Sequence, residues 1–517
     1  MDGSEAREFD ILLQLFKGKA GTIRAPWKNR SKESLNDLGS LQMHPEGWQS
    51  VVSLKQSPFL VVKQLDNESR VYSKLHGNLT SYHFDITEVL KLFDRQIDIK
   101  TAVNEISKIY RSEPLSLIKE LYEKRFLVEG NKNKENMLSE YVGDLKNKNK
   151  ISKVSKVTFL VSAKCNLACK GCYHNFFNFQ STNMKSDFAD QILKGLFPYL
   201  KRRGIRTLLV SFLGYEPLLN FETLRGIYDR TFNMGEEHGV KTLFRTHTNA
   251  FSITEEIFEW MGQNKSRLEI MVSLDGIRED NDKRRVDSFG RGTYVRVIEN
   301  LKRIINAGVE CGVLTVLSKL NFSNIERFVD EMAAIGIKNI IANIFCGHSN
   351  DERLMELTDL EKFEAIKRME LSTEKYNIGF GGEWKFAVAQ MITGAHFFCP
   401  AGVKQLVFCA DGVIYPCQRF AGTEVNFGTY EKDFWEKLDD GQCESYNRWT
   451  ADLYNSITER TREDGNDFTG CGCPFLPFIR GECMSKYLER EFNEYLLEYY
   501  LTRPLNRILA KAITTMC

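Results

Sequence analysis

The sequence predicts an α/β protein whose centre is a partial (β/α)6 barrel, with an α+β domain before it and a cysteine-rich domain after it. Apolar strand-like runs alternate with helix-period segments between 153 and 345, and eight of the 13 cysteines lie between Cys399 and Cys517. Such alternation is typical of a parallel sheet with right-handed crossovers. Six units are fewer than the eight that close a full barrel, so one side should stay open.

The six units are defined by β-branched and aromatic runs separated by amphipathic stretches. The predicted strands are Lys156–Ser162, Thr207–Leu213, Lys241–Thr246, Leu268–Leu274, Glu310–Leu317 and Asn339–Phe345. The predicted helices cover 186–203, 221–238, 254–263, 293–307 and 323–335. In barrels of this type the active site lies at the carboxyl ends of the strands, so the functional residues are expected in the loops that follow the strands.

Residues 1–48 are polar and irregular, and the first folded unit is expected at 49–130. Three short strands are predicted there, followed by three helices and a closing strand at 126–128, which is a winged-helix-like arrangement. The strands are Gln49–Gln56, Phe59–Leu65 and Ser69–His76, and the helices are Asp85–Asp94, Ile99–Tyr110 and Glu113–Lys124. An Asn- and Lys-rich stretch at 131–152 is predicted to be a linker.

Beyond the barrel at 153–345, a helical bridge is expected at 346–395 and a cysteine-rich domain of short elements at 396–490. The last segment, 491–517, is assigned to a C-terminal helix. We expect this helix to run from about Ser485 to Tyr500 and to pack against the rest of the protein.

The overall charge gives no sign of a nucleic-acid or membrane partner. The 517 residues include 70 basic and 69 acidic side chains, for a formal net charge of +1. The amino terminus lacks the apolar core of a secretory signal, and no run approaches the roughly 20 apolar residues of a membrane helix. We therefore expect a cytoplasmic protein, in which clustered cysteines are usually metal ligands rather than disulfides.

The strongest motif follows the first barrel strand, in the segment VTFLVSAKCNLACKGCYHN. Cys165, Cys169 and Cys172 have the spacing C-x3-C-x2-C. Three thiolates can hold three irons of a [4Fe–4S] cluster and leave the fourth iron open to a ligand. A zinc site is the alternative, but structural zinc normally requires four protein ligands.

This motif resembles the signature of the radical S-adenosylmethionine (SAM) superfamily. The resemblance implies that the open iron binds the methionine moiety of S-adenosylmethionine, and that a 5′-deoxyadenosyl radical then abstracts hydrogen from the substrate. It makes Cys165, Cys169 and Cys172 the catalytic cluster ligands and places Tyr173 against the adenine. It also implies an external electron donor such as flavodoxin or ferredoxin.

Further landmarks of that family occur in order at the predicted strand ends. Gly214-Tyr215-Glu216-Pro217 resembles its GGEP motif, with Tyr in place of the second Gly, which puts the local backbone geometry in question. Thr248-Asn249 resembles the element after the third strand, and Ser273-Leu274-Asp275-Gly276 the element where Ser meets the ribose. Arg284 or Arg285, with Arg285 preferred, lies where the family places an arginine near the cofactor carboxylate.

The second cysteine group resembles a SPASM domain, the family's extension for auxiliary clusters. Asp411-Gly412 predicts a hairpin turn between Cys409 and Cys417. The downstream spacing departs from the family pattern, so the number of auxiliary clusters stays undecided between one and two. Cys517 is a possible substitute ligand. The expected auxiliary ligands are Cys399, Cys409, Cys417, Cys443, Cys471, Cys473 and Cys483. Cys311 and Cys346 are expected to be buried apolar residues.

The unit at 49–130 resembles a PqqD-like peptide-recognition domain. An exposed third strand near 70–76 could accept a peptide by strand addition, with the helix at 99–110 supplying pockets. The leading hypothesis is a ribosomal-peptide maturase that binds a precursor peptide and installs a carbon–carbon or thioether crosslink.

Two other functions stay open. One is a formylglycine-generating sulfatase maturase, against which Gln418 counts because that family has Asp after the cysteine. The other is a non-catalytic iron–sulfur scaffold or regulator. Polar candidates at the barrel mouth are His174, Glu216, His247 and Asp275.

Overall fold

The computed structural model describes residues 51–148 apart from 77, 111 and 112, then 153–172 and 174, 182–347, 349–382 and 384, 400–463 and 490–503. The sequence predictions for 1–48, Tyr173, Cys399, Cys471, Cys473, Cys483 and Cys517 lie outside these residues.

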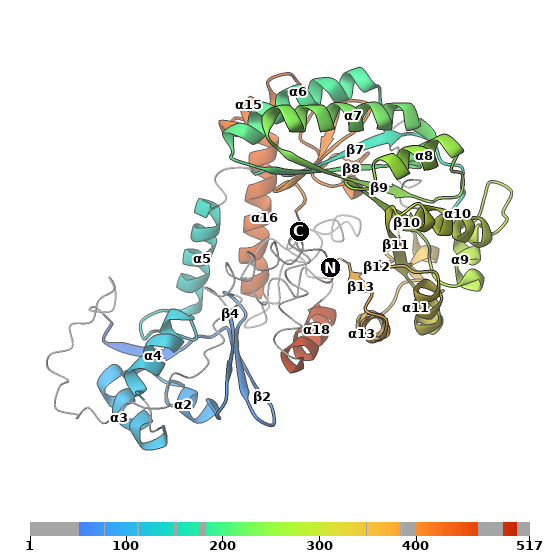
Figure 1. Ribbon diagram of the computed structural model, residues 1–517. Coiled ribbons are helices and arrows are strands. Elements are labelled where there is room, and N and C mark those ends of the chain that lie inside the picture. Colours follow the sequence, from blue (N-terminus) through green and yellow to red (C-terminus); the bar gives the residue numbers. More distant parts are fainter. Residues whose placement is uncertain are drawn as a thin grey trace.

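The largest sheet among the described residues is curved, with its helices on the convex side (Figure 1). The six predicted strands all form: β7 (Lys156–Ser162), β8 (Thr207–Gly214), β9 (Lys241–Thr248), β10 (Leu268–Ser273), β11 (Glu310–Leu317) and β12 (Asn339–Ile344). The helices between them are α6 (Ser186–Arg202), α7 (Phe221–His238), α8 (Glu255–Gln263), α9 (Arg278–Arg284), α10 (Tyr294–Asn306) and α11 (Ile325–Ala334). All neighbouring pairs from β7 to β12 are parallel.

The sheet is wider than the sequence predicted, because one further strand joins it beside β12 and two join it at the β7 end. β13 (Gly379–Gly381) pairs in parallel with β12, although the sequence placed it in a helical bridge. Its Gly-Phe-Gly sequence is too short and too glycine-rich to be recognised as a strand. The rest of that region contains α12 (Asn350–Arg353) and α13 (Asp359–Lys375).

At the other end, the cysteine-rich region joins the barrel sheet directly. β14 (Gln405–Phe408) pairs in parallel with β7, with Gln405 opposite Lys156, and β15 (Ile414–Tyr415) pairs antiparallel with β14. The predicted hairpin turn is confirmed, since Gly412 has a φ of +88° that glycine adopts easily. The expectation of short elements alone was wrong, because α15 (Phe434–Asp439) is followed by the 20-residue helix α16 (Glu444–Glu463).

The N-terminal unit contains two small antiparallel sheets and three helices. One sheet has the order β5 (Ile97–Asp98), β1 (Ser53–Gln56), β6 (Leu127–Glu129), and the other β2 (Leu60–Gln64), β3 (Ser69–Ser73), β4 (Asn78–Tyr82). The helices are α2 (Thr87–Lys91), α3 (Ile99–Ile109) and α4 (Pro114–Glu123). The prediction of an exposed third strand was wrong: β3 is central, all five of its residues are buried, and β4, which the sequence did not predict, occupies the edge.

The predicted linker is largely a helix, α5 (Lys134–Lys148). Its apolar residues Met137, Leu138, Tyr141 and Val142 lie on one face and form a small core with Tyr454 of α16. This burial stabilises a helix that the Asn- and Lys-rich composition alone would not.

The last described helix, α18 (Arg490–Thr502), packs against α13, where the Tyr500 hydroxyl donates to Glu370 at 3.0 Å. No helix within the described ranges is both long enough and apolar enough to cross a membrane.

Candidate functional site at the carboxyl ends of the barrel strands

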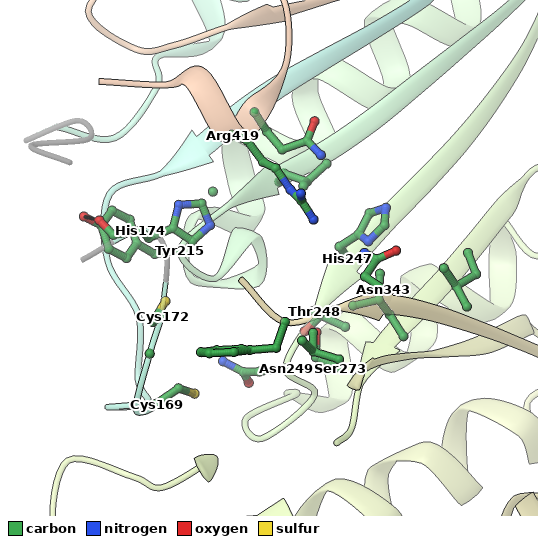
Figure 2. A pocket seen from close by; sticks show the side chains of 18 of the residues that line it. Cys169, Cys172, His174, Tyr215, His247, Thr248, Asn249, Ser273, Asn343 and Arg419 are labelled. Carbon is green, nitrogen blue, oxygen red and sulfur yellow. Dashed lines mark hydrogen bonds between the residues drawn. The ribbon is translucent and has the colours of Figure 1, made fainter. Parts of the chain in front are cut away.

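The cysteine loop follows β7 and is tied to the segment that follows α9. The Ala168 amide donates to the Val286 carbonyl at 2.8 Å, and the Lys170 amide to the Arg284 carbonyl at 2.9 Å. Held in this way, Cys165, Cys169 and Cys172 line one cavity of about 400 Å³. Figure 2 shows Cys169 and Cys172 in this cavity. The predicted cysteine triplet is therefore brought to a single cavity at the carboxyl end of the first barrel strand.

The three thiols fit the coordination of an iron–sulfur cluster. A [4Fe–4S] cluster binds each cysteine at a different iron, so three cysteines that line one cavity can hold three irons and leave the fourth open. Burial, with a smaller contribution from nearby Glu216, raises the pKa of the Cys165 thiol to about 11, although the hydrogen bond from the Leu167 amide acts in the opposite direction. Metal binding must therefore displace the proton, as is usual for thiolate ligands.

Gly214 ends β8 at a point where the backbone passes very close to β7. Its φ is +129°, and a Cβ there would stand 2.6 Å from the Ser162 carbonyl oxygen. Glycine is therefore required, and its backbone lines the cavity. Tyr215, which replaces the family's second glycine, does not have a positive φ, and its hydroxyl donates to the His174 carbonyl at 3.0 Å. The tyrosine is thus compatible with the turn.

Glu216 lies behind the cavity wall and joins the ends of β8 and β9. Its carboxylate accepts from the Thr248 hydroxyl at 2.8 Å, the Asn249 amide at 2.7 Å and the Leu218 amide at 3.1 Å. Burial raises the pKa of Glu216 to about 7, although these donors act in the opposite direction. Glu216 and the adjoining Pro217 are buried and do not line the cavity, so their role here is to position the residues that do.

Asn249 connects the end of β9 to the cysteine loop. Its side-chain amide donates to Asn166 Oδ1 at 2.8 Å and lies 3.6 Å from the Cys165 sulfur. Thr248 and Asn249 both line the cavity, as predicted.

Ser273 and two arginines also line the cavity. Arg284 and Arg285 line the cavity, and both donate to the buried Asp275 behind them, Arg285 Nε at 2.7 Å. Burial raises the pKa of Asp275, but the two arginines outweigh it and hold the pKa below its usual value. Asp275 therefore stays ionised and orients the arginines rather than facing the cavity itself.

Several lining residues carried no sequence motif. Asn343 and Cys346 come from the end of β12, and Gln405 and Arg419 from the cysteine-rich region. The prediction that Cys346 is a buried apolar residue was wrong, since its side chain is only half-buried and lines the cavity, whereas Cys311 is buried as predicted. For Asn343, its position near the end of a predicted strand was the one sequence signal that could have indicated a place in the cavity.

Two histidines predicted at the barrel mouth are both found there. His174 and His247 line the cavity, and burial lowers the pKa of each to about 3. Both imidazoles are therefore neutral near pH 7.

The predicted auxiliary ligands are only partly described. Cys417 lines the cavity, whereas Cys409 is buried in the main core and Cys443 is buried with its sulfur 3.7 Å from the Ser445 hydroxyl. The other predicted auxiliary ligands fall outside the described residues.

Comparison with known proteins agrees with this geometry. Residues 159–332 match the family model described as the radical SAM superfamily. The chain is 23% identical over 391 residues to the radical SAM cyclopropyl synthase TigE of Paramaledivibacter caminithermalis, covering 72% of this chain and 80% of that protein. It is 26% identical over 364 residues to a serine-type anaerobic sulfatase-maturating enzyme of Bacteroides thetaiotaomicron, covering 64% of this chain and 82% of that protein.

Among solved structures, the chain is similar to anSMEcpe with bound AdoMet and the Kp18Cys peptide. The TM-score is 0.52 at 15% identity, over 70% of this chain and 99% of that one. This likeness shows a shared fold. Together with the cysteine loop and the strand-end elements around one cavity, these findings show that the chain contains a radical SAM domain at residues 159–332.

Proposed function

We propose that this protein is a radical SAM peptide maturase, which binds a ribosomally made precursor peptide and installs a carbon–carbon or thioether crosslink. One observation carries the proposal: the cysteine triplet, the strand-end elements and Cys417 of the cysteine-rich region all line a single cavity. A [4Fe–4S] cluster and S-adenosylmethionine, when bound there, supply a carbon radical that removes hydrogen from the substrate. An auxiliary cluster held by Cys417 would border the same cavity and accept the surplus electron.

The residues of the chain bind and orient these groups. Cys165, Cys169 and Cys172 hold the cluster. Arg285 offers a guanidinium to the cofactor carboxylate, and Ser273 a hydroxyl to its ribose. Behind the cavity wall, Asp275 orients Arg285 and Glu216 orients Thr248, which would position the reacting groups.

The N-terminal unit is proposed to hold the leader of the peptide along β4. Among the described strands, β4 has one neighbour, β3, so its outer edge can accept an added strand. Its side chains reach α4: Asn78 donates to the Lys124 carbonyl at 2.8 Å, and the Tyr82 hydroxyl to Glu120 at 3.1 Å. α4 therefore lies beside this edge and can supply side-chain contacts to a bound peptide. This arrangement supports a PqqD-like role for the unit.

Sulfatase maturation is the second candidate, favoured by the 26% identity to the Bacteroides enzyme. The presence of Gln418 is evidence against this function. Its side-chain oxygen accepts from Gln405 Nε2 at 3.2 Å on the cavity wall, and a carboxamide cannot act as a general base. A purely structural iron–sulfur scaffold would need no cofactor-binding wall.

The proposal is tested with anaerobically reconstituted protein, dithionite and S-adenosylmethionine. Iron is counted and 5′-deoxyadenosine is followed by mass spectrometry, with peptides encoded beside the gene and a sulfatase-derived peptide as substrates. About 12 irons per chain would fit three clusters. A Cys165/Cys169/Cys172→Ala variant should lose about four of them and all 5′-deoxyadenosine.

Cys311→Ala is the matched control, because Cys311 is buried in the core away from the cavity. Wild-type protein that binds iron but never cleaves the cofactor would contradict the enzyme assignment. Formylglycine in the sulfatase peptide, with no crosslink in any other peptide, would select the second candidate.

A further inference from the structure

The sulfur of Cys165 differs from the other two sulfurs of the cysteine triplet in its hydrogen bonds. The Leu167 amide donates to it at 3.4 Å, and the side-chain amide of Asn249 donates to it at 3.6 Å. Among the hydrogen bonds of the described residues, none reaches the sulfur of Cys169 or Cys172. Within this part of the chain, Cys165 is therefore the ligand whose sulfur faces polar hydrogens.

The orientation of Asn249 is fixed on every side. Its Oδ1 accepts from the Phe251 amide at 2.9 Å, and its Nδ2 donates to Asn166 Oδ1 at 2.8 Å. Its backbone amide donates to Glu216 at 2.7 Å, and the residue is only 7% exposed. A carboxamide nitrogen carries two hydrogens, so with one bonded to Asn166 the other remains for the Cys165 sulfur. The donor is thus already in position in the protein without a cluster.

Asn166 brings a second carboxamide to the same place, because it is the residue after Cys165. Its Oδ1 is occupied by Asn249. Its Nδ2 is buried and has no hydrogen-bond partner in the described part of the chain. A buried donor without a partner costs free energy, and it indicates that another group binds there. The sulfurs of a bound cluster are acceptors, so they fit this donor.

Donors at the sulfurs of a cluster change its reduction potential. The reduced cluster carries one more negative charge than the oxidised cluster, so a hydrogen bond to its sulfurs stabilises the reduced form more. Loss of such a donor should therefore lower the potential. Asn249 follows β9, so this contact connects the barrel wall to the electron affinity of the cluster.

We propose that Asn249 and Asn166 form a donor pair that sets the reduction potential of the bound cluster. Asn249 is a positioning residue that acts through the Cys165 sulfur and holds Asn166, whose remaining amide hydrogens are available to the cluster. The inference goes beyond the proposed peptide function, because it requires the cluster but no peptide.

The potential is measured by a redox titration of the anaerobically reconstituted protein without S-adenosylmethionine, followed by electron paramagnetic resonance. The signal that the triple cysteine-to-alanine variant lacks belongs to this cluster. Asn249→Leu, which loses the donor, should shift the reduction equilibrium about 10-fold toward the oxidised cluster, or about 59 mV for a one-electron couple. Asn249→Asp also loses the donor but keeps an oxygen for the Phe251 amide, so it should fold and shift in the same direction. Asn166→Leu should lower the potential as well.

Asn300→Leu is the matched control. Asn300 donates to the Ala250 carbonyl at 2.8 Å, so it supports the same loop after β9 without a contact to sulfur. Its removal should leave the potential unchanged. Equal shifts in Asn300→Leu and Asn249→Leu would overturn the proposal, because loosening of the loop would then be the cause. A shift in Asn249→Asp but not in Asn249→Leu would also overturn it, because the added charge alone would explain it.

A spectroscopic signature tests the contact directly. In protein labelled with nitrogen-15 at its asparagine side chains, the reduced cluster should show a hyperfine coupling to the label. This coupling should weaken in Asn249→Leu and disappear in the Asn166→Leu/Asn249→Leu double variant. A coupling that persists unchanged in the double variant would contradict the proposal.

These measurements separate this inference from the proposed function, because neither needs a substrate. The expected shifts in potential, without modification of any peptide, would refute the peptide function alone. Crosslinked peptide together with unchanged potentials would refute the donor pair alone.

Discussion

At the residue scale, the site depends on buried charged groups that do not themselves face the cavity. Glu216 and Asp275 are both 2% exposed, and each fixes groups that line the wall. Their environments differ. Asp275 has two arginines and stays ionised, whereas Glu216 accepts bonds from two backbone amides and a hydroxyl, and burial raises its pKa to about 7. Similar carboxylates therefore respond differently to pH.

Glu216 should make the apoprotein less stable as pH rises. Its pKa is raised from 4.5 to about 7 on folding, so its contribution is fully present below pH 4.5 and is lost as pH rises through 7. Relative to Glu216→Gln, which does not titrate, the wild-type free energy of unfolding should fall by roughly 3 kcal/mol over this range. Urea unfolding of the wild-type and Glu216→Gln apoproteins at pH 4.5 and 7.5, under anaerobic conditions, measures this difference in the free energy of unfolding. Glu222→Gln, which changes an exposed residue of α7, is the control. Parallel pH profiles for wild type and Glu216→Gln would contradict the prediction.

At the element scale, the wall of the cavity requires β7 and β8 to approach closely at their carboxyl ends. The register between them shifts between Leu160 and Ser162, where Ser162 comes to face Gly214. Gly214 allows this approach because it has no Cβ and tolerates a positive φ. The turn that carries Tyr215 and Glu216 starts from this point, so its geometry depends on one glycine.

Gly214→Ala should lower the free energy of unfolding by about 2–3 kcal/mol, because the new methyl group meets the Ser162 carbonyl at a strained φ. It should also weaken S-adenosylmethionine binding by moving Tyr215. Gly262→Ala is the control, since a Cβ in that α8 position meets nothing within 4 Å and should raise stability by up to about 1 kcal/mol. Urea unfolding and equilibrium dialysis measure the two effects. If Gly214→Ala and Gly262→Ala have equal free energies of unfolding, the prediction is wrong, because β7 and β8 then move apart at Gly214 without loss of stability.

At the scale of the whole molecule, α18 connects the N-terminal unit to the barrel. The buried Arg70 of β3 donates to the Leu501 carbonyl at 2.7 Å and to that of Arg503, at the carboxyl end of α18. On its other side α18 packs on α13, where Arg503 pairs with Glu374 at 2.8 Å. The proposed peptide-binding sheet is therefore fixed to the catalytic body through a helix distant in sequence (Figure 1).

Arg70→Met should loosen this connection, because buried carbonyls at the end of α18 lose their charged donor. We expect a loss of about 1.5–3 kcal/mol in the opening free energy of α18, seen as faster amide hydrogen exchange of Leu496 and Leu497. Barrel strands such as β9 should exchange at the wild-type rate. Lys91→Met, which removes an exposed charge from α2, is the control. Unchanged exchange in α18 would mean that Arg70 contributes nothing to the docking.

The sequence by itself determined the six barrel strands, the helices between them, the cysteine loop and the strand-end elements. These depend on local periodicity and on short spacings, and a parallel β/α series brings its strand ends to one edge of the sheet. Only the tertiary structure decided that β13 and β14 extend the sheet, that α5 is a helix and that β3 is central in its sheet. It also decided that Asn249 contacts the Cys165 sulfur. Each of these depends on pairing or burial between segments far apart in the chain, and such contacts leave no pattern in the local sequence.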